Sequence, residues 1–568
     1  MKKYNTSDIK RTARIGALLD DLFAKMPEIE ADRAVLITES YKQTEDKPII
    51  MRRALAFSHI MKNIPITIRD NELIVGSSTK APRGCQVYPE FSYEWLEGEL
   101  DTVSEREADP FYISEETKAE LRRVFPYWKG KTTSELATAY MAPEAILAIE
   151  HNMFTPGNYF YNGVGHFTVK YDEVINLGLE SIISRVNDKL ASLELSDPEY
   201  SVKHEFYEAC IISCQAVIEY AHRYSELAMN MANRCTDAER KQELLCIAKN
   251  CARVPQYPAE DFYEACQSFW FIQQVIQLES SGHSISPGRF DQYMYPLYKK
   301  GIYDGTLNRE FAQELLDCIW IKFNDLNKCR DAASAEGFAG YSLFQNLCAG
   351  GQTVDGEDAV NDLSFQCIQA SMHTLLPAPS FSVRIWNGTP NEFMIKCAEL
   401  TRTGIGLPAY YNDEIIIPSL LSRGVALEDA RNYSIIGCVE PQAQGKTHGW
   451  HDAAFFNMLR PLELVFSNGY DKGVQVGLNT GDVSSFATFD DFVHAYKQQS
   501  DYQIALMVNA NNSIDIAHKE RCPLPFVSCL VDDCIDRAKS MEEGGARYNF
   551  TGPQGFGIAN VTDALYLS

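Results

Sequence analysis

The stretch YSIIGCVEP, residues 433–441, begins with a short apolar run and continues through a glycine to a proline. A short apolar run followed by such residues is typical of a buried strand. Three earlier segments have the same character: YSLFQNLCAGGQ (341–352), PSFSVRIWNG (379–388) and GLPAYYND (406–413). Helices are expected between these segments, near 360–373, 391–404 and 427–432. Strands that alternate with helices in this way predict an α/β architecture.

Helical spacing of apolar positions dominates the remainder of the chain. It recurs over 171–193, 203–232, 236–250, 259–279 and 308–326, and the fourth of these segments is apolar nearly all round, which predicts a deeply buried helix. The segment IPITIRDNELIVGS (64–77) predicts two short strands around an Asp-Asn turn. No repeat or linker divides the chain, so we expect one domain over residues 1–568, continuous with a helical N-terminal region at about 1–250.

The composition is that of an acidic globular protein. Its 568 residues carry 77 acidic and 52 basic side chains, a net charge of −25. Nucleic acids and anionic membranes are bound through basic surfaces, so neither is expected as a partner. The 16 cysteines contain no C-x-x-C pair, and the N-terminal residues contain no apolar stretch like that of a signal peptide. With no apolar run near the ~20 residues of a membrane span, these features predict a cytoplasmic protein in a reducing compartment.

Cys438 and Glu440 are the strongest candidates for chemistry. They lie two residues apart, so an extended backbone would place both side chains on one face. A thiol and a carboxylate that project together can relay a hydrogen atom or a proton. Gly437 allows the backbone to bend, and Pro441 stiffens the segment that follows. The alternative that the spacing alone favours is a buried structural cysteine at the end of a strand, beside an exposed glutamate.

Three further segments place histidine or aspartate among glycines: GKTHGWHD (445–452), NGVGH (162–166) and SGHSISPGR (281–289). Glycine lets a backbone approach a small ligand, although each histidine taken singly is more often a loop or core residue. The H-x-x-H of the first segment lacks a further ligand at a diagnostic spacing, so no metal site is expected. Two phosphate-binding patterns also fail, because GPQGFGIAN (552–560) lacks a third glycine in register and AGGQTVDG (349–356) lacks the Lys-Ser/Thr of a P-loop.

In combination, these segments resemble the glycyl radical enzyme family. GCVEP (437–441) is similar to the family's cysteine-loop motif, and the resemblance extends in order over nearly the whole chain. It is strongest toward the cobalamin-independent glycerol and propane-1,2-diol dehydratases. The other segments that carry it are RAVLITES (33–40), GKTTSELATAYM (130–141), NYFYNGVGHFTV (158–169), SGHSISPGRFDQYMYP (281–296), FAGYSLFQN (338–346), GLPAYYNDE (406–414) and GWHDAAFFN (449–457).

The resemblance implies a fold and the partners that the enzyme needs. The family fold is a ten-stranded α/β barrel of two antiparallel half-sheets, with helices outside and the cysteine loop inside. A glycine loop with the pattern R-V-x-G-Y enters from a C-terminal domain. An activating enzyme that uses S-adenosylmethionine and an iron–sulfur cluster converts its glycine to a stored radical. No cofactor is expected to bind this chain directly, and homodimers and a bacterial, anaerobic setting, in some cases a microcompartment, are typical of this functional class.

R-V-x-G-Y is absent from residues 1–568, and a helix begins only a few residues before the chain ends. We therefore expect a barrel that is truncated at its C-terminal end and lacks the glycine radical domain. Such a barrel would expose strand edges and apolar surface.

The matching positions imply roles for seven residues. Cys438 would become the thiyl radical that takes a hydrogen atom from the terminal carbinol carbon of a small diol substrate. Glu440 would deprotonate the hydroxyl on that carbon, and His166 would protonate the neighbouring hydroxyl so that it leaves as water and the product is an aldehyde. Hydrogen bonds to the two hydroxyls would come from Asp452, His283 and Ser284, with Tyr341 lining the pocket.

Two other reactions of the family and a non-catalytic role are the alternatives to diol dehydration. Val439 stands where pyruvate-cleaving members carry a second cysteine, which argues against formate acetyltransferase chemistry. Choline trimethylamine-lyases share GCVEP, but His166 and Asp452 resemble a diol pocket. We expect propane-1,2-diol or glycerol as the substrate, and SGHSISPGRFDQY and GYSLFQN favour propane-1,2-diol. The alternative from another class is a non-catalytic fragment, or a split-enzyme subunit that binds a separate glycine-domain polypeptide.

Overall fold

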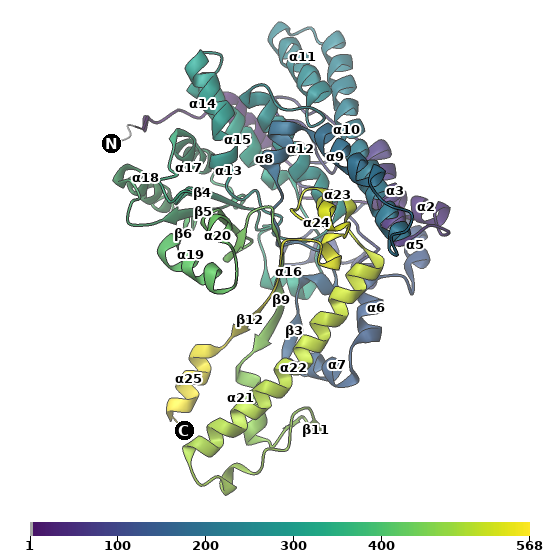
Figure 1. Ribbon diagram of the computed structural model, residues 1–568, viewed down its shortest axis with the longest axis vertical. Coiled ribbons are helices and arrows are strands. Elements are labelled where there is room, and N and C mark those ends of the chain that lie inside the picture. Colours follow the sequence, from purple (N-terminus) through teal and green to yellow (C-terminus); the bar gives the residue numbers. More distant parts are fainter. Residues whose placement is uncertain (1–3, 568) are drawn as a thin grey trace.

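The regular structure in the N-terminal half of the chain is mostly helical, with three short strands among its described residues. The structure is a computed structural model, and it describes residues 4–567, apart from the side chain of Leu567. Figure 1 shows α10 and α11 as long helices at the top of the molecule. The helices of this half are α1 (Ala13–Leu22), α2 (Asp32–Gln43), α3 (Ile49–Asn63), α4 (Glu94–Glu99), α5 (Glu115–Trp128), α6 (Thr133–Tyr140), α7 (Pro143–Glu150), α8 (Tyr171–Leu177), α9 (Leu179–Ala191), α10 (Tyr200–Arg234), α11 (Ala238–Arg253) and α12 (Phe262–Glu279), with the 3-10 turns η1 (Val103–Glu105) and η2 (Asn158–Phe160).

Helices and strands alternate in the second half, as the sequence predicts. The helices are α13 (Phe290–Tyr293), α14 (Tyr295–Asp304), α15 (Arg309–Asp325), α16 (Ala332–Gly337), α17 (Asp362–Thr374), α18 (Asn391–Thr401), α19 (Asp413–Ser422), α20 (Leu427–Arg431), α21 (Leu459–Phe466), α22 (Phe489–Arg521), α23 (Pro525–Cys529), α24 (Cys534–Arg537) and α25 (Ile558–Leu567), with the 3-10 turns η3 (Val483–Ser485) and η4 (Met541–Glu543). The strands of the chain are β1 (Ile29–Glu30), β2 (Cys85–Gln86), β3 (Phe154–Pro156), β4 (Asn346–Gly350), β5 (Ser380–Ile385), β6 (Ala409–Asn412), β7 (Tyr433–Ile436), β8 (Glu440–Ala443), β9 (Thr447–Asn457), β10 (Tyr470–Asp471), β11 (Val474–Gln475) and β12 (Tyr548–Phe556).

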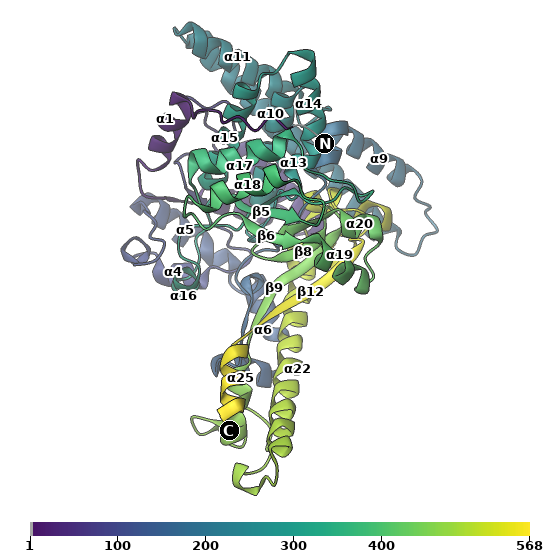
Figure 2. The same cartoon turned by 90° about the vertical axis from the view of Figure 1, so that its left-hand side faces the viewer.

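The strands between residues 4 and 567 pair in five small sheets. Strands β4, β5 and β6 pair parallel, β7 and β8 pair antiparallel, and the long β9 pairs parallel with β12 and antiparallel with β3. Figure 2 shows β5, β6, β8, β9 and β12 following one another across the middle of the molecule. The α/β class is therefore confirmed. The described strands do not hydrogen-bond into one continuous ten-stranded sheet, and their pairing is both parallel and antiparallel.

Helix α12 forms the centre of the core, as its apolar character predicts. All of its residues are buried. Two of its glutamines bind the backbone of neighbouring segments: Gln267 bonds both the N–H and the C=O of Val75, and Gln273 donates to the C=O of Ile285. A buried polar group is stable only when it is hydrogen-bonded, so these glutamines attach the surrounding loops to the helix.

Two local predictions are wrong. Residues 64–77 form no strand, because side chains satisfy their backbone: Arg223 binds the C=O of Ile64, and Trp270 binds that of Gly76. The helix expected over 171–193 is broken at Gly178, whose φ of +77° interrupts the turn between α8 and α9.

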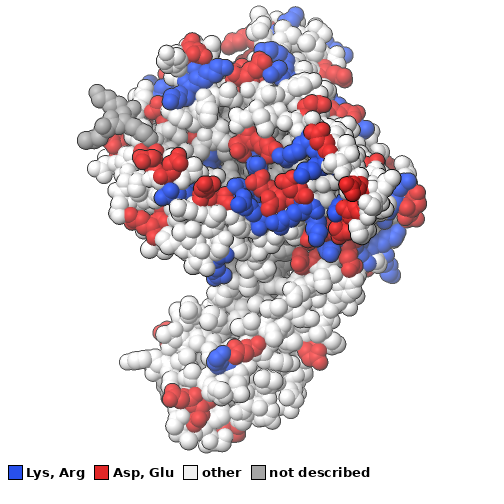
Figure 3. Space-filling view, in the orientation of Figure 1, with Lys and Arg blue, Asp and Glu red and all other residues white. Residues whose placement is uncertain are grey.

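On the face of the molecule that Figure 3 shows, the charged side chains gather over the upper body. The lower projection, built from α21, α22 and α25, carries few of them on this face. Exposed apolar side chains on and beside this projection include Phe466, Phe489, Val508, Phe556 and Ile558. None of the helices between residues 4 and 567 combines the length and the apolar character that crossing a membrane requires.

Candidate active site

Cys438 lies in the turn that joins β7 to β8. The strands pair with Ile436 opposite Glu440, so Gly437, Cys438 and Val439 form the connection. Gly437 has a φ of +62°, a left-handed conformation that glycine adopts at low cost. The predicted extended segment is therefore wrong, because the glycine turns the chain. Cys438 is exposed, whereas the side chain of Glu440 is only 8 % exposed. The alternative of a buried structural cysteine beside an exposed glutamate predicts the opposite.

Hydrogen bonds from three directions hold the backbone of this turn. The N–H of Gly437 donates to Ser286 Oγ at 3.1 Å, and its C=O accepts from Asn346 Nδ2 at 2.9 Å. The hydroxyl of Tyr411 donates to the C=O of Cys438 at 2.8 Å. These partners come from the 281–289 segment, β4 and β6, so separate parts of the fold set the position of the thiol.

Three predicted site residues converge on Gly437. A Cβ added to this glycine would lie 2.8 Å from Ser284 Oγ, 3.0 Å from Glu440 Oε2 and 3.0 Å from His166 Cδ2. Distances this short leave no room for a side chain, so the glycine is required by space as well as by its φ. The structure therefore brings Cys438, Glu440, His166 and Ser284 to one point, although they are separated by up to 274 residues in the sequence numbering.

Glu440 and Asp452 form a pair of buried carboxyl groups. Glu440 Oε2 accepts from the N–H of Val439 at 2.9 Å, and Asp452 Oδ2 accepts from Asn158 Nδ2 at 2.7 Å. Burial raises the pKa of Glu440. Burial, and then the nearby charge of Glu440, raises the pKa of Asp452 to about 7. The site can therefore hold and exchange protons near neutral pH.

The proton on His166 is placed by Tyr159. His166 Nδ1 lies 2.9 Å from the Tyr159 hydroxyl oxygen, and that hydroxyl donates its only hydrogen to the C=O of His451. The Tyr159 oxygen must therefore accept from an N–H on Nδ1, which leaves the lone pair of neutral His166 on Nε2. Burial, with a smaller effect from His451, lowers the pKa of His166 to about 3. The resting imidazole is therefore neutral, with a known tautomer.

His283 and Arg330 form the next layer. The Nε of Arg330 donates to His283 Nε2 at 3.0 Å, and the C=O of His283 accepts from the N–H of His166 at 2.8 Å. Burial and the Arg330 charge hold the pKa of His283 well below its usual range. His283 therefore supports the backbone of His166 and stays uncharged.

Ser284 and Tyr341 are placed differently. Ser284 has a φ of +61°, and its Oγ approaches Gly437. The Tyr341 hydroxyl donates to the C=O of Pro110 at 2.7 Å, and its ring packs against Phe111 and Arg83. These contacts attach Tyr341 to the 109–111 segment, and within residues 4–567 no hydrogen bond joins its hydroxyl to the Cys438 turn.

The electrostatic setting of Cys438 keeps its thiol protonated. Partial burial of the sulfur, followed by the charges of Glu440 and Asp452, raises the pKa of Cys438 to about 12, and Arg330 opposes this effect. Nucleophilic cysteines need a lowered pKa because the thiolate is the reactive form. A thiol that retains its hydrogen suits hydrogen-atom transfer better than nucleophilic attack.

Several residues of the site were not predicted. Tyr159 and Asn158 lie in NYFYNGVGH, from which only His166 was selected. Arg330 carries no local motif. Gln554 belongs to GPQGFGIAN, which resembles only an incomplete phosphate-binding pattern in the sequence, and its amide reaches both Glu440 and Asp452. The glycines around these residues were the available signal, since they mark close backbone approach.

A cavity of about 480 Å³ adjoins the site. Asn158 lines it and also donates to Asp452, so the residue connects the cavity with the buried carboxyl group. Phe338, Phe455 and Phe556 form its apolar side. The volume is ample for a small polar substrate.

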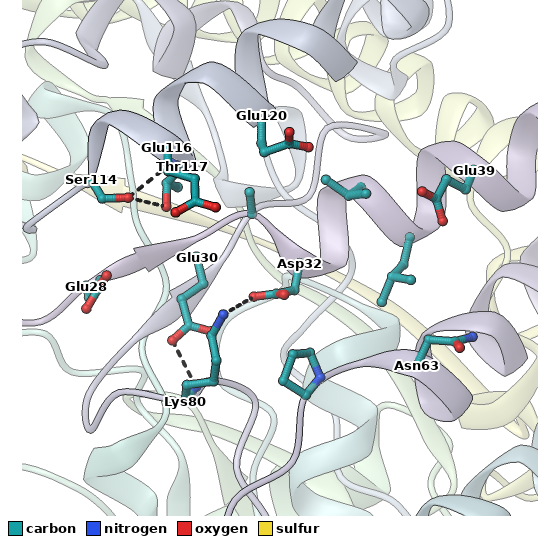
Figure 4. Close-up of a pocket in the computed structure, with 14 residues that line it drawn as sticks. Glu28, Glu30, Asp32, Glu39, Asn63, Lys80, Ser114, Glu116, Thr117 and Glu120 are labelled. Atoms are coloured by element: carbon teal, nitrogen blue, oxygen red, sulfur yellow. Dashed lines mark hydrogen bonds and ion pairs between the residues drawn. The ribbon is translucent and has the colours of Figure 1, made fainter.

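A second cavity, of about 470 Å³, lies between β1, α2 and α5 (Figure 4). It is lined by carboxylates, and Lys80 Nζ pairs with Asp32 Oδ2 at 3.1 Å while the Lys80 N–H donates to Glu30. No residue of the Cys438 site lines this cavity. Among residues 4–567, no group of three or more His, Cys, Asp or Glu side chains is arranged to hold a metal ion.

Comparison with known proteins identifies the family. Residues 6–566 match the family described as Pyruvate formate lyase-like. The chain belongs to this family of glycyl radical enzymes. The (2S)-3-sulfopropanediol dehydratase of Klebsiella oxytoca is 35% identical over 97% of this chain and 68% of that protein. The trans-4-hydroxy-L-proline dehydratase of Clostridioides difficile is 35% identical over 95% of this chain and 69% of that protein. The protein is an enzyme, a lyase of the glycyl radical family.

Solved structures of this family agree with the fold. The structure described for 1,2-propanediol dehydration in Roseburia inulinivorans superposes with a TM-score of 0.98 and is 65% identical, over 99% of this chain and 67% of that one. The glycerol-bound B12-independent glycerol dehydratase from Clostridium butyricum gives a TM-score of 0.96 and 54% identity, over 98% of this chain and 71% of that one. The fold is therefore that of the glycyl radical enzyme barrels, and this chain spans about two thirds of the length of these relatives.

Proposed function

We propose that this protein dehydrates a small vicinal diol, propane-1,2-diol or glycerol, to an aldehyde. The observation that carries the proposal is the convergence of Glu440, His166 and Ser284 on Gly437, the residue that precedes Cys438 in the chain. A base, an acid and a hydrogen-atom carrier at one point are the groups that this reaction needs. Two similar structures are described for 1,2-propanediol dehydration and for glycerol dehydratase, which supports the choice of substrate.

The chemistry assigns one step to each group. As a thiyl radical, Cys438 would take a hydrogen atom from C1 of the diol and re-form its S–H bond. Glu440 would accept the proton of the C1 hydroxyl, which pushes electron density toward the C2–O bond. That bond would break as His166 gives a proton to the departing oxygen, so that water leaves. The carbon radical, now at C2 of an aldehyde, would take the hydrogen atom back from Cys438.

His166 can give a proton only as the imidazolium. Its neutral form carries its single N–H on Nδ1, toward Tyr159, and a second proton must therefore be held on Nε2. Ionised Glu440 and Asp452 would favour this charged form, because opposite charges nearby stabilise it. After each cycle Glu440 holds an extra proton and His166 lacks one, and exchange with solvent would restore both.

An uncharged substrate suits the cations of the site. Arg330 binds His283 and the C=O of Ser342, and Lys328 donates to the carbonyls of Ser280 and Gly282. Among the described residues, these two cations beside the site are engaged by the protein itself. A sulfonate or carboxylate group would need a free cationic partner, so we favour a neutral diol over the sulfonate and the amino acid that the names of the 35%-identical relatives give.

The proposal includes partners and a setting. In this family an activating enzyme installs a glycyl radical, which supplies the first thiyl radical. A glycine loop would store this radical, and a homodimer in the bacterial cytoplasm, or in a microcompartment, fits this class of reaction.

The test of the proposed function is a comparison of substrates. The chain would be incubated anaerobically with the activating enzyme and a glycine-loop polypeptide. Propane-1,2-diol, glycerol, (2S)-3-sulfopropanediol and trans-4-hydroxy-L-proline would each be supplied, and products would be identified by NMR. We expect propanal to form fastest, 3-hydroxypropanal to follow, and no product from the sulfonate or the amino acid. Turnover of either of these two compounds with neither small diol would contradict the proposal.

A further inference from the structure

Gln554 reaches the site from β12, a strand distant from it in sequence. Strand β12 runs parallel to β9, which carries Asp452. The pairing is irregular at this point. Gly552 on β12 pairs with His451 on β9, but Gln554 pairs with Phe455, so β9 contains extra residues between these two pairs. Bulges of this kind re-aim side chains. Asp452 lies in the bulged part of β9, with a φ of +60°, and its carboxyl group meets the side chain of Gln554.

The amide of Gln554 is shared between the two carboxyl groups. Its Nε2 lies 3.0 Å from Asp452 Oδ1 and 3.4 Å from Glu440 Oε1. The other oxygen of each carboxyl group has its own donor, Asn158 for Asp452 and the Val439 N–H for Glu440. A primary amide has two N–H bonds, so one residue can donate to both groups. Gln554 is thus the only described side chain that joins Glu440 and Asp452 directly.

We propose that Gln554 is a positioning residue, which holds Glu440 and Asp452 at a fixed separation by donating one N–H to each. Two carboxyl groups this close oppose each other's ionisation. A donor held between them stabilises the charged form of both and prevents them from sharing a proton. Glu440 then stays available as a base while Asp452 binds a hydroxyl. This role deepens the proposed function and rests on it for its catalytic meaning.

Cys438 provides a readout that needs no catalysis. Ionised Glu440 and Asp452 oppose formation of the Cys438 thiolate, which is the form that is alkylated. A plot of the logarithm of the alkylation rate against pH therefore changes slope in the range where these two carboxyl groups lose their protons, and this change of slope is called the bend. Arg330 has the opposite effect. Other titratable groups that face the turn and its two carboxyl groups include Tyr159, Tyr411 and the neutral His166 and His283.

The experiment compares Gln554→Met with the wild type. Methionine keeps the length of the side chain but removes both donors. Iodoacetamide labelling of the Cys438 peptide would be followed by mass spectrometry from pH 5 to 9. Loss of a hydrogen bond to a charged group raises the pKa of a carboxyl group, so we expect the bend to move up by about one pH unit. The control is Gln475→Met on the exposed strand β11, which should leave the bend in place.

A second variant keeps the proposal testable if the first does not fold. Gln554→Glu preserves shape and adds a third carboxyl group, so it should raise the bend and slow labelling at pH 8. A bend at the wild-type pH in a folded Gln554 variant would overturn the proposal.

Calorimetry with propane-1,2-diol separates the positioning role of Gln554 from the proposed dehydratase function. A shifted bend without diol binding to the wild type would support the positioning role and count against the dehydratase, whereas diol binding with an unshifted bend would do the reverse.

Discussion

The tautomer of His166 depends on a single hydroxyl group. Tyr159 donates to the C=O of His451 and can therefore only accept from His166 Nδ1. The Nε2 of the imidazole is thereby reserved for the proton that the leaving hydroxyl would receive. Without Tyr159, the neutral ring could place its hydrogen on either nitrogen, and part of the population would be unsuited to the reaction.

Replacement of Tyr159 by phenylalanine tests this dependence. We expect kcat to fall roughly tenfold with little change in KM, because only part of a general-acid contribution of about 10²- to 10⁴-fold would be lost. Tyr303→Phe, at a side chain that is 89% exposed, is the matched control. Steady-state rates of aldehyde formation measure both variants. A raised KM with an unchanged kcat would instead assign Tyr159 to substrate binding.

Spacing in the sequence could indicate Cys438 and Glu440 but not their geometry. A separation of two residues suggests that both side chains share one face of a strand. Gly437 instead makes a turn that leaves Cys438 exposed and buries the carboxyl group of Glu440. Tyr159 and Gln554 could not be predicted from their own segments. Their roles arise from partners 292 and 114 residues away, and such pairings form only in the folded chain.

At the scale of elements, a buried ion pair joins the strands that lead to Cys438. Arg384 on β5 makes two hydrogen bonds of 2.8 Å to Asp413, at the start of α19, and both side chains are fully buried. Arg384 also binds the C=O of Tyr433, the first residue of β7, and the Tyr433 hydroxyl donates to Asp413. The pair therefore fixes β5, α19 and β7 relative to one another.

Asp413→Ala should be strongly destabilising. It would leave the Arg384 charge buried without a partner, and breaking a buried pair in this way costs about 3–5 kcal/mol. Denaturant unfolding followed by circular dichroism measures the change. Asp501→Ala, in the exposed pair with Lys497, is the control and should leave the unfolding midpoint close to that of the wild type. Equal midpoints for the two variants would contradict the structural role of the Arg384 pair.

Elements with strong periodicity were predictable, and those held by side chains were not. The segments at 203–232, 236–250, 259–279 and 308–326 are helices in the structure because each buries an apolar face. The 64–77 segment has the composition of strands, yet Gln267, Trp270 and Arg223 take the places of a strand partner. Periodicity reports burial, but it does not report which group will satisfy the backbone.

For the whole molecule, buried acids make stability depend on pH. Burial, and then the charge of Glu279, raises the pKa of Glu542 to about 8, far above the value of about 4.3 in an unfolded chain. Between these two values the folded state holds a proton that the unfolded state releases. The contribution of Glu542 to stability is therefore complete below about pH 4 and is lost as the pH rises toward 8.

Glu542→Gln should remove this dependence. The glutamine cannot ionise and still offers an oxygen to the Leu524 N–H, the partner of Glu542 at 3.1 Å. Relative to that of the wild type, the free energy of unfolding of the variant should increase by up to about 1.4 kcal/mol for each pH unit between about pH 5 and 8. Below about pH 4.5 the two proteins should differ little in stability. Denaturant unfolding at several pH values measures this gain, and Glu226→Gln on the exposed side of α10 is the control. Parallel stability curves for Glu542→Gln and the wild type would refute it.

The fate of the hydrogen atom taken from C1 tests the central claim most directly. Propane-1,2-diol with two deuterium atoms on C1 would be supplied to the chain with the activating enzyme and a glycine-loop polypeptide, and the propanal would be analysed by NMR. We predict one deuterium on C1 and one on C2, since Cys438 returns to C2 the atom that it took from C1, and no propanal with Cys438→Ser. Propanal whose C2 hydrogen comes only from solvent, or whose formation survives Cys438→Ser, would contradict the account.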